Sequence, residues 1–131
     1  MAGIFARIAS GELSSYKIAE DEFFFAFLDV NPLVKGHTLI IPKKEINYIF
    51  NMDDHLYAEF HLFAKRIAVA LKKAIPCKRI GIAVIGLEVP HAHIHLVPLN
   101  TMEDINFSRS KIKLSEEEFI EIADNIISYL T

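Results

Sequence analysis

The segment His91-Ala-His93-Ile-His95-Leu-Val97 alternates histidines with apolar residues. Side chains alternate between the two faces of a strand, so the pattern predicts a strand with all three histidines on one face. The apolar residues between them would then face the core of a sheet. Histidine serves as nucleophile, proton donor or metal ligand near neutral pH, so the row indicates a chemical site.

Strand-like segments dominate the middle of the chain. We expect strands at residues 16–20, 23–30, 37–42, 80–85 and 91–97, with the last two forming a hairpin around a short loop at 86–90. Proline or glycine and polar residues punctuate the connections.

Three helices complete the expected set. A short one contains Ile4, Phe5 and Ile8. A long one runs from Asp53 or Asp54 to about residue 74, because apolar residues recur there at helical spacing. The last helix opens with the capping box at 115–118. Strands and helices do not alternate regularly, so we expect an α+β fold: an antiparallel sheet, a long helix packed on it and a C-terminal helix.

Length and composition exclude several classes of protein. The 131 residues fit one domain, 1–131, with a core at about 4–98 and a C-terminal extension bearing the helix 115–130. A net charge of −3 argues against binding long nucleic acid. No apolar run is long enough for a membrane span, and no signal peptide is recognised. The single Cys77 excludes an internal disulfide and a cysteine-rich zinc site, so a cytoplasmic location is expected.

The histidine row allows three interpretations. The histidines could simply face solvent on an edge strand. They could bind a metal, with His37 supplying a further nitrogen. They could instead catalyse covalent chemistry at phosphorus, because a neutral imidazole, with an ordinary pKa of about 6.5, is nucleophilic at neutral pH. Flanking histidines would orient the nucleophile and protonate the leaving group. Three same-face histidines span about 13 Å, too far for one ion, so we favour covalent catalysis.

The histidine segment resembles the histidine triad (HIT) motif, and three other segments share the resemblance. Residues 36–43, Gly-His-Thr-Leu-Ile-Ile-Pro-Lys, are similar to a strand typical of that family. Residues 27–32, Phe-Leu-Asp-Val-Asn-Pro, resemble its acidic turn, and residues 4–13 resemble its N-terminal segment. These elements follow one another in the family's order.

The resemblance implies an activity and a role for each matched residue. It implies hydrolysis of nucleoside phosphoramidates and related nucleotidyl compounds, with no cofactor and in a homodimer whose sheets join. The substrate would be a purine nucleotide or nucleotidyl conjugate. His93 would be the nucleophile, His95 would contact the phosphate and leaving group, and His91 and His37 would form a supporting relay. Asp29 would bind the ribose, and the base pocket would be lined by Phe5, Ile8, Phe27 and Val30.

The loop before the triad departs from the family pattern. Residues 86–90, Gly-Leu-Glu-Val-Pro, form a shorter loop that lacks the usual Asn and Gln, whose side chains help to hold the phosphate. This departure keeps open a non-catalytic or very slow nucleotide-binding module. A metal-dependent hydrolase, which the histidine row itself allows, is a second alternative.

Overall fold

The computed structural model describes residues 2–130. Its sheet has five strands in the order β1-β2-β3-β5-β4, and every neighbouring pair is antiparallel. The strands are β1 (Lys17–Glu20), β2 (Phe24–Leu28), β3 (Thr38–Pro42), β4 (Arg79–Ala83) and β5 (Ile94–Leu99). The helices are α1 (Ile4–Ala9), α2 (Asp54–Ala74) and α3 (Glu116–Ile127), with short 3-10 helices η1 (Ile49–Asn51) and η2 (Met102–Ile105). The predicted α+β class is confirmed.

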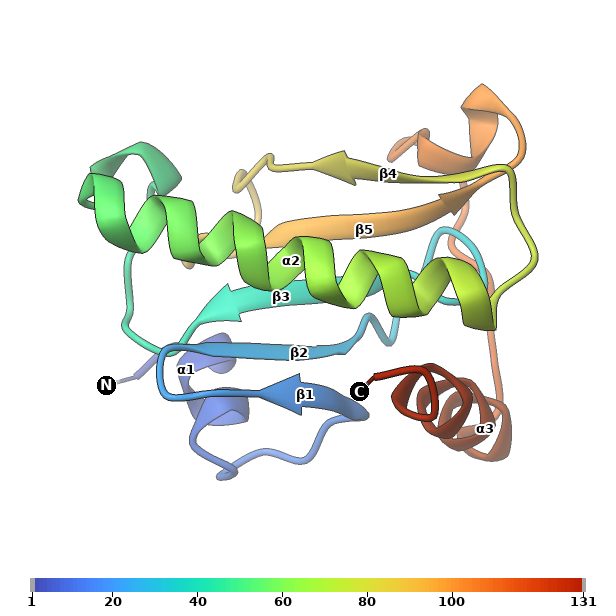
Figure 1. Ribbon diagram of the computed structural model, residues 1–131, viewed down its shortest axis with the longest axis horizontal. Coiled ribbons are helices and arrows are strands. Elements are labelled where there is room, and N and C mark those ends of the chain that lie inside the picture. The colour runs from blue at the N-terminus through green and yellow to red at the C-terminus, as the bar shows by residue number, and fades with distance from the viewer. Residues whose placement is uncertain (1, 131) are drawn as a thin grey trace.

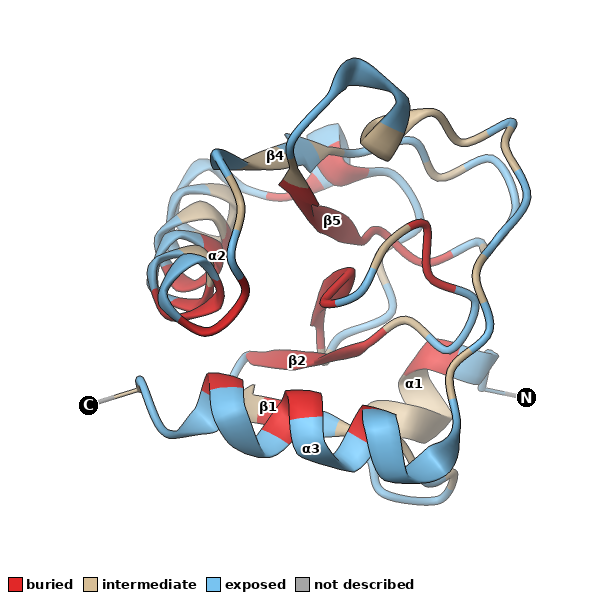
Figure 2. Ribbon diagram, turned by 90° about the vertical axis from the view of Figure 1, so that its right-hand side faces the viewer, coloured by how far each residue is buried: buried red, intermediate tan, exposed pale blue. Residues whose placement is uncertain are grey.

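The two faces of the sheet are covered by different helices. α2 lies across one face, whereas α1 lies on the opposite face (Figures 1 and 2). α3 packs beside β1 and against α2 (Figure 2). Its buried residues Phe119, Ile122 and Ile126 join the same apolar cluster as α2, and the Phe119 ring stacks on Tyr16 at 4.8 Å. The C-terminal helix therefore completes the core of its own chain.

The alternation of side chains in β2 and β3 builds two apolar clusters. Phe24, Ala26 and Leu28 point into the main core beneath α2. Phe25 and Phe27 point the other way, into a second cluster beneath α1. Because both faces are covered, every residue of β2 and β3 is buried.

The long helix begins and ends as its sequence predicts. The Asp53 side chain accepts a hydrogen bond from the Leu56 N–H, which caps the first turn. A stripe that includes Phe60, Ile67 and Leu71 is buried against the sheet. Within residues 2–130, no helix is both long and apolar enough to cross a membrane.

The histidine strand is shorter than predicted. β5 begins at Ile94, so His91 and His93 lie in the connection from β4, which spans residues 84–93. The reason is a non-local hydrogen bond: the Ala92 N–H donates to the Ile46 carbonyl at 2.7 Å, away from β4. The alternation of faces nevertheless holds, because Ala92 and Ile94 belong to the main core.

Candidate active site

The three histidines of the triad and His37 meet on the α1 side of the sheet. His91 is 2% exposed, His93 is 6%, His95 is 8% and His37 is 2%. These small fractions exclude the interpretation of solvent-facing histidines on an edge strand. Buried polar side chains need hydrogen-bond partners, and those partners decide which ring nitrogen of each histidine carries a proton.

His93 is oriented by a backbone carbonyl. Its Nδ1 atom lies 2.7 Å from the carbonyl oxygen of His91. A carbonyl oxygen only accepts, so Nδ1 carries the proton, and in the neutral ring Nε2 keeps its lone pair. The edge of the Phe5 ring packs against this imidazole, with ring centroids 5.1 Å apart. His93 therefore has the tautomer in which Nε2 is a nucleophile.

His37 supports His95 through a directed chain of hydrogen bonds. The Leu33 N–H donates to His37 Nδ1 at 3.0 Å, which leaves the proton of His37 on Nε2. That Nε2–H donates to His95 Nδ1 at 2.9 Å. His95 therefore carries its own proton on Nε2. Sequence analysis expected His37 to support the nucleophile, but the hydrogen bond of its ring goes to His95.

Burial keeps the hydrogen-bonded imidazoles of His37 and His95 uncharged. It lowers the pKa of His37 to about 3 and that of His95 to about 4, and in both cases neighbouring positive charge acts in the same direction. Protonated His37 would also direct an Nδ1–H at the Leu33 N–H, where no acceptor is available. Both rings are therefore neutral at neutral pH, and His95 is a hydrogen-bond donor without an additional proton.

His91 contributes mainly through its backbone. Its Nε2–H donates to the Pro42 carbonyl at 2.8 Å, while its Nδ1 is buried without a hydrogen-bond partner among the described residues. Burial lowers its pKa. The only hydrogen bond between His91 and His93 within residues 2–130 uses the carbonyl oxygen of His91. The side chain of His91, held by its hydrogen bond to Pro42, fixes the position of that carbonyl.

Asp29 directly follows β2 and lies next to the hydrogen-bonded pair of His37 and His95. One carboxylate oxygen, Oδ1, accepts the Asn31 N–H at 2.8 Å. The other, Oδ2, lies 3.6 Å from His37 Nε2, and burial raises the pKa of this carboxyl group. Since His37 is neutral, this contact is not an ion pair at neutral pH. Asp29 is half-buried, and the next residue, Val30, is 59% exposed.

A family model for the HIT domain matches residues 10–102. The chain belongs to the HIT family. A HIT-like protein of Borreliella burgdorferi is 38% identical over 131 residues, which cover 94% of each chain. The adenosine 5'-monophosphoramidase of Saccharomyces cerevisiae is 35% identical over 98 residues, which cover 74% of this chain and 62% of that protein.

Solved structures of HIT proteins share the fold. A Hit-like protein involved in cell-cycle regulation from Bartonella henselae superposes with a TM-score of 0.84, at 28% identity, over 98% of this chain and 96% of that one. A zinc-bound histidine triad family protein from Mycobacterium smegmatis gives a TM-score of 0.81, at 26% identity, over 99% of this chain and 94% of that one.

One group of side chains in this HIT protein has the composition of a metal site. Ligand atoms of Asp29, His37 and His95 all lie within 4.8 Å of one another. The hydrogen bonds of the group oppose this use, because His37 Nε2 carries a proton and a ligating nitrogen must offer a lone pair. Metal binding there would require the other tautomer of His37 and would leave the Leu33 N–H without its acceptor. The geometry therefore favours a chain of hydrogen bonds over a metal centre.

The shortened loop of this HIT protein packs against the second apolar cluster. Val89 contacts that cluster, and its carbonyl accepts the His91 N–H at 2.8 Å. Leu87 is 88% exposed, and Glu88 is exposed as well. Neither Leu87 nor Val89 can donate a side-chain hydrogen bond, and Pro90 has no N–H. The structure thus gives the loop no replacement for the missing Asn and Gln side chains.

Sequence analysis missed two residues of the site. The Leu33 N–H fixes the tautomer of His37, and the Phe107 ring lies edge-on to His95, with centroids 4.8 Å apart. Leu33 acts through its backbone, which no side-chain pattern reveals. Phe107 belongs to the irregular segment after the triad, where no motif drew attention to it. Of the expected lining residues, Phe5 contacts His91, His93 and Phe27, and Ile8 packs on the same apolar cluster.

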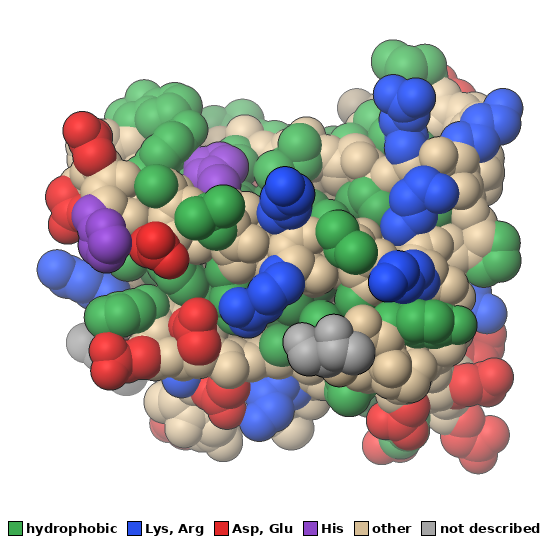
Figure 3. Space-filling view, viewed as in Figure 1, with side chains coloured by type: hydrophobic (Ala, Val, Ile, Leu, Met, Phe, Trp, Pro, Cys, Tyr) green, Lys and Arg blue, Asp and Glu red, His purple; other side chains and the backbone are tan. Residues whose placement is uncertain are grey.

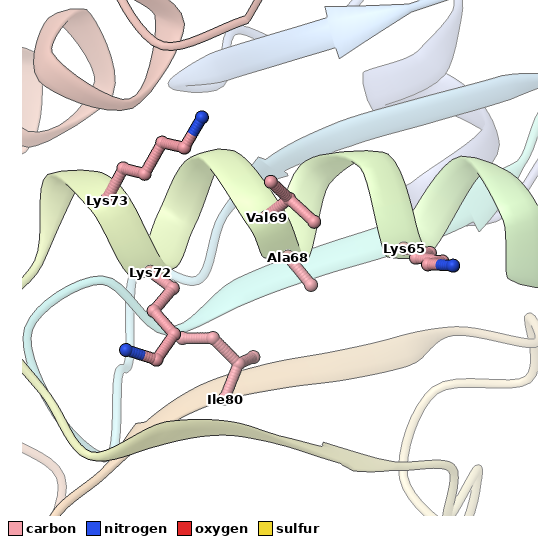
Figure 4. A pocket seen from close by; sticks show the side chains of 6 residues that line it. All are labelled: Lys65, Ala68, Val69, Lys72, Lys73 and Ile80. Carbon is pink, nitrogen blue, oxygen red and sulfur yellow. The ribbon is translucent and has the colours of Figure 1, made fainter.

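A separate groove lies on the far side of the sheet, between α2 and β4. It has a volume of about 540 Å³ and is lined by Lys65, Ala68, Val69, Lys72, Lys73 and Ile80 (Figure 4). Basic side chains gather around it on the α2 face, with apolar side chains between them (Figure 3). It contains none of the histidines of the candidate active site and is therefore separate from that site.

Proposed function

We propose that this protein is a nucleotidyl hydrolase or transferase acting on conjugates of nucleoside monophosphates, phosphoramidates or related compounds, through a covalent nucleotidyl-His93 intermediate. The observation that carries the proposal is the hydrogen bond from His93 Nδ1 to the His91 carbonyl, which leaves Nε2 as the nucleophile. The similarity to a phosphoramidase supports the class of substrate.

The reaction divides into two displacements at phosphorus. His93 Nε2 attacks the phosphorus, the bond to the leaving group breaks, and that group departs with the bonding electrons, an amine taking up a proton from water as it leaves. Water then attacks the same phosphorus, the P–Nε2 bond breaks, and the water proton passes to solvent. The Nε2–H of His95 donates a hydrogen bond to a phosphate oxygen or to the leaving group during both steps.

The nucleoside would be held beside the histidines. Asp29 Oδ2, which no backbone N–H of residues 2–130 occupies, would accept from the ribose hydroxyls. Phe5, Ile8 and Phe27 would form the apolar floor beneath a purine base, and the exposed Val30 would form its rim. Asp29 and Phe27 are two residues apart at the end of β2, so ribose and base would bind side by side. No cofactor is needed for this chemistry.

The test is capture of the intermediate. Incubation with adenosine 5'-phosphoramidate should add one adenylyl group to the protein, seen by intact mass and located on His93 by peptide mapping. The His93→Ala variant should lose the adduct and at least about a thousandfold of the rate, as nucleophile removal does elsewhere. His55→Ala, which changes an exposed histidine of α2, is the matched control. Undiminished turnover by His93→Ala would overturn the proposal.

A nucleotide-binding module with little or no catalysis is the second candidate. It is favoured by the loop at 86–90, whose side chains provide no donors for the phosphate. Losing such donors costs roughly 10²–10³ in rate. Tight binding of adenosine monophosphate in calorimetry, with no turnover and no adduct, would select this candidate.

We also propose a homodimer formed through β4 and α2, acting in the cytoplasm. β4 is the last strand of the sheet, so its outer edge offers unpaired backbone groups to a second sheet. Ile82 on β4 is 55% exposed, and Leu62 and Val69 on α2 are 58% and 51% exposed. A two-fold contact would cover this apolar surface and the groove beside it, and would join two sheets into one. The single cysteine fits a reducing compartment.

A further inference from the structure

The segment 106–112, named here the 106–112 arm, is fixed beside the active site at two points. At one end the Phe107 ring lies against His95, with centroids 4.8 Å apart, and against His37 at 6.2 Å. At the other end the Ile112 N–H donates to the Pro32 carbonyl at 3.0 Å. Pro32 directly precedes Leu33, whose N–H donates to His37 Nδ1. The 106–112 arm therefore makes contacts at both ends of the series of hydrogen bonds that runs from Leu33 through His37 to His95.

Lys111 is the cation that this arm holds near the site. Its Nζ donates to the Phe107 carbonyl at 2.9 Å and lies 3.4 Å from the Arg109 carbonyl. An ammonium group has three N–H donors, so one is left for a ligand. The guanidinium of Arg109, by contrast, is engaged by the Glu103 carbonyl and the Asp104 carboxylate. Lys111 is exposed. Its hydrogen bond to the Phe107 carbonyl holds the ammonium group at the residue whose ring contacts His95.

The charge of Lys111 acts on one side of the triad. Burial is the main cause of the pKa shifts of Asp29, His37 and His95, and Lys111 is among the nearby charges that affect all three. The nearby charges that affect the pKa of His91 are those of Glu45 and His93. Bonded to the carbonyl of Phe107, whose ring lies against His95, Lys111 is on the His95 side of the triad, where the proposed function places the leaving group.

We propose that Lys111 is a specificity-determining residue, which favours nucleotidyl conjugates whose leaving group itself carries a negative charge. The proposal rests on the proposed function, because it concerns the charge of the leaving group, which that function places beside His95. Electrostatic attraction to the ammonium would orient such a group before the reaction and stabilise it as the bond to phosphorus breaks.

The state of His95 agrees with this preference. Its neutral ring donates a hydrogen bond through Nε2–H but has no additional proton to transfer. A leaving group that departs as an anion needs no proton, whereas ammonia or an amine must gain one. In the first displacement the P–O bond breaks, its electrons remain on the departing oxygen, and Lys111 offsets the negative charges of that group.

A matched pair of substrates tests the proposal. Both are aryl esters of adenosine monophosphate with 4-nitrophenol, and one carries an added carboxylate on the ring. The wild-type protein should have a kcat/KM about tenfold higher for the carboxylated ester, the ratio expected from one well-placed charge. Lys111→Met should abolish this preference, and Lys111→Arg should retain it. Raising the ionic strength should reduce the preference, since the charge is exposed.

The controls separate this proposal from the proposed function. Lys113→Met removes the same charge two residues along the chain and should keep the preference. If Lys111→Met slows both esters equally, Lys111 serves the reacting phosphate and the proposal is overturned. Unchanged rates for both esters in Lys111→Met overturn it as well. If the wild-type protein turns over neither ester and forms no His93 adduct, the proposed function itself fails.

Discussion

Leu33 contributes only a peptide N–H to the site, yet that N–H determines the protonation of two imidazoles. Because it donates to His37 Nδ1, the proton of His37 must lie on Nε2, and the proton of His95 must also lie on Nε2. The His91 carbonyl imposes the opposite tautomer on His93. At the residue scale, neighbouring backbone groups give chemically identical side chains different roles.

The tautomers can be observed directly. In ¹⁵N NMR spectra of the neutral protein, His37, His91 and His95 should show the Nε2–H pattern and His93 should show the Nδ1–H pattern. The reason is that backbone groups fix the tautomers of His37, His91 and His93, and His37 in turn fixes that of His95. An Nε2–H tautomer of His93 would contradict the assignment of Nε2 as the nucleophile.

Stability should depend on acid through His37 and His95. Unfolded histidine binds a proton below a pKa of about 6.5, whereas in the folded protein these rings resist protonation down to about 3 and 4. Between these values the unfolded state holds more protons. The free energy of unfolding should therefore fall as pH drops from about 6.5 to 4, by up to about 1.4 kcal/mol per pH unit for each ring.

Urea denaturation at a series of pH values measures this slope. His37→Asn should make it shallower by about one proton, even though the variant is less stable overall. His55→Asn on the surface of α2 should leave the slope as it is. An unchanged slope in His37→Asn would show that His37 is not the source of the acid sensitivity.

At the scale of elements, the connection from β2 to β3 sets the position of His37. Gly36 has φ +93°, and a Cβ there would lie 3.0 Å from Ile75 Cγ1 and 3.2 Å from Pro98 Cγ. The chain thus turns tightly against the C-terminal end of α2 and against β5 immediately before His37. A side chain at residue 36 would strain both the backbone and the packing.

Gly36→Ala should cost more stability than Gly11→Ala. Gly11 also has a positive φ, +85°, but no described atom lies within 4 Å of the position of its Cβ. The control should therefore lose only the backbone cost of about 1–2 kcal/mol, and Gly36→Ala should lose about 1–3 kcal/mol more. Chemical denaturation of both variants measures the difference. Equal losses would mean that residue 36 has more room than the structure gives it.

The elements also show what sequence can and cannot predict. The stripe of α2 and the capping box of α3 are local patterns predicted from the sequence, and the structure confirms them. The start of β5 could not be predicted, because it depends on a hydrogen bond from Ala92 to Ile46. The pairing of His37 with His95 and the contact of Phe107 likewise join distant segments, and no periodicity marks such contacts.

At the scale of the whole molecule, the candidate active site and the proposed dimer surface occupy opposite faces of one sheet. The histidines lie on the α1 side, and the groove lies between α2 and β4. That residues 1–131 form one domain remains a prediction; the packing of α3 into the main core supports it. The location and the oligomeric state are also still predictions.

A charged residue at the exposed strand edge should separate the proposed dimer. Ile82→Glu places two like charges near a two-fold contact, and burying an unpaired carboxylate there is costly. Light scattering after size exclusion should give a dimer for the wild-type protein and a monomer for Ile82→Glu. Ile120→Glu, on the exposed face of α3, should remain dimeric. A monomeric wild-type protein would refute the proposal.

The series of hydrogen bonds through His37 ends at the peptide group of Leu33, so it cannot conduct protons from the interior of the protein to His95. The Leu33 N–H is a peptide donor that does not release its proton, so it cannot replace a proton that His37 passes on. The interior therefore supplies no proton to His95, and a departing amine would have to gain its proton from the side where substrate and water enter. In the proposed reaction, protons would therefore exchange only between the site and solvent.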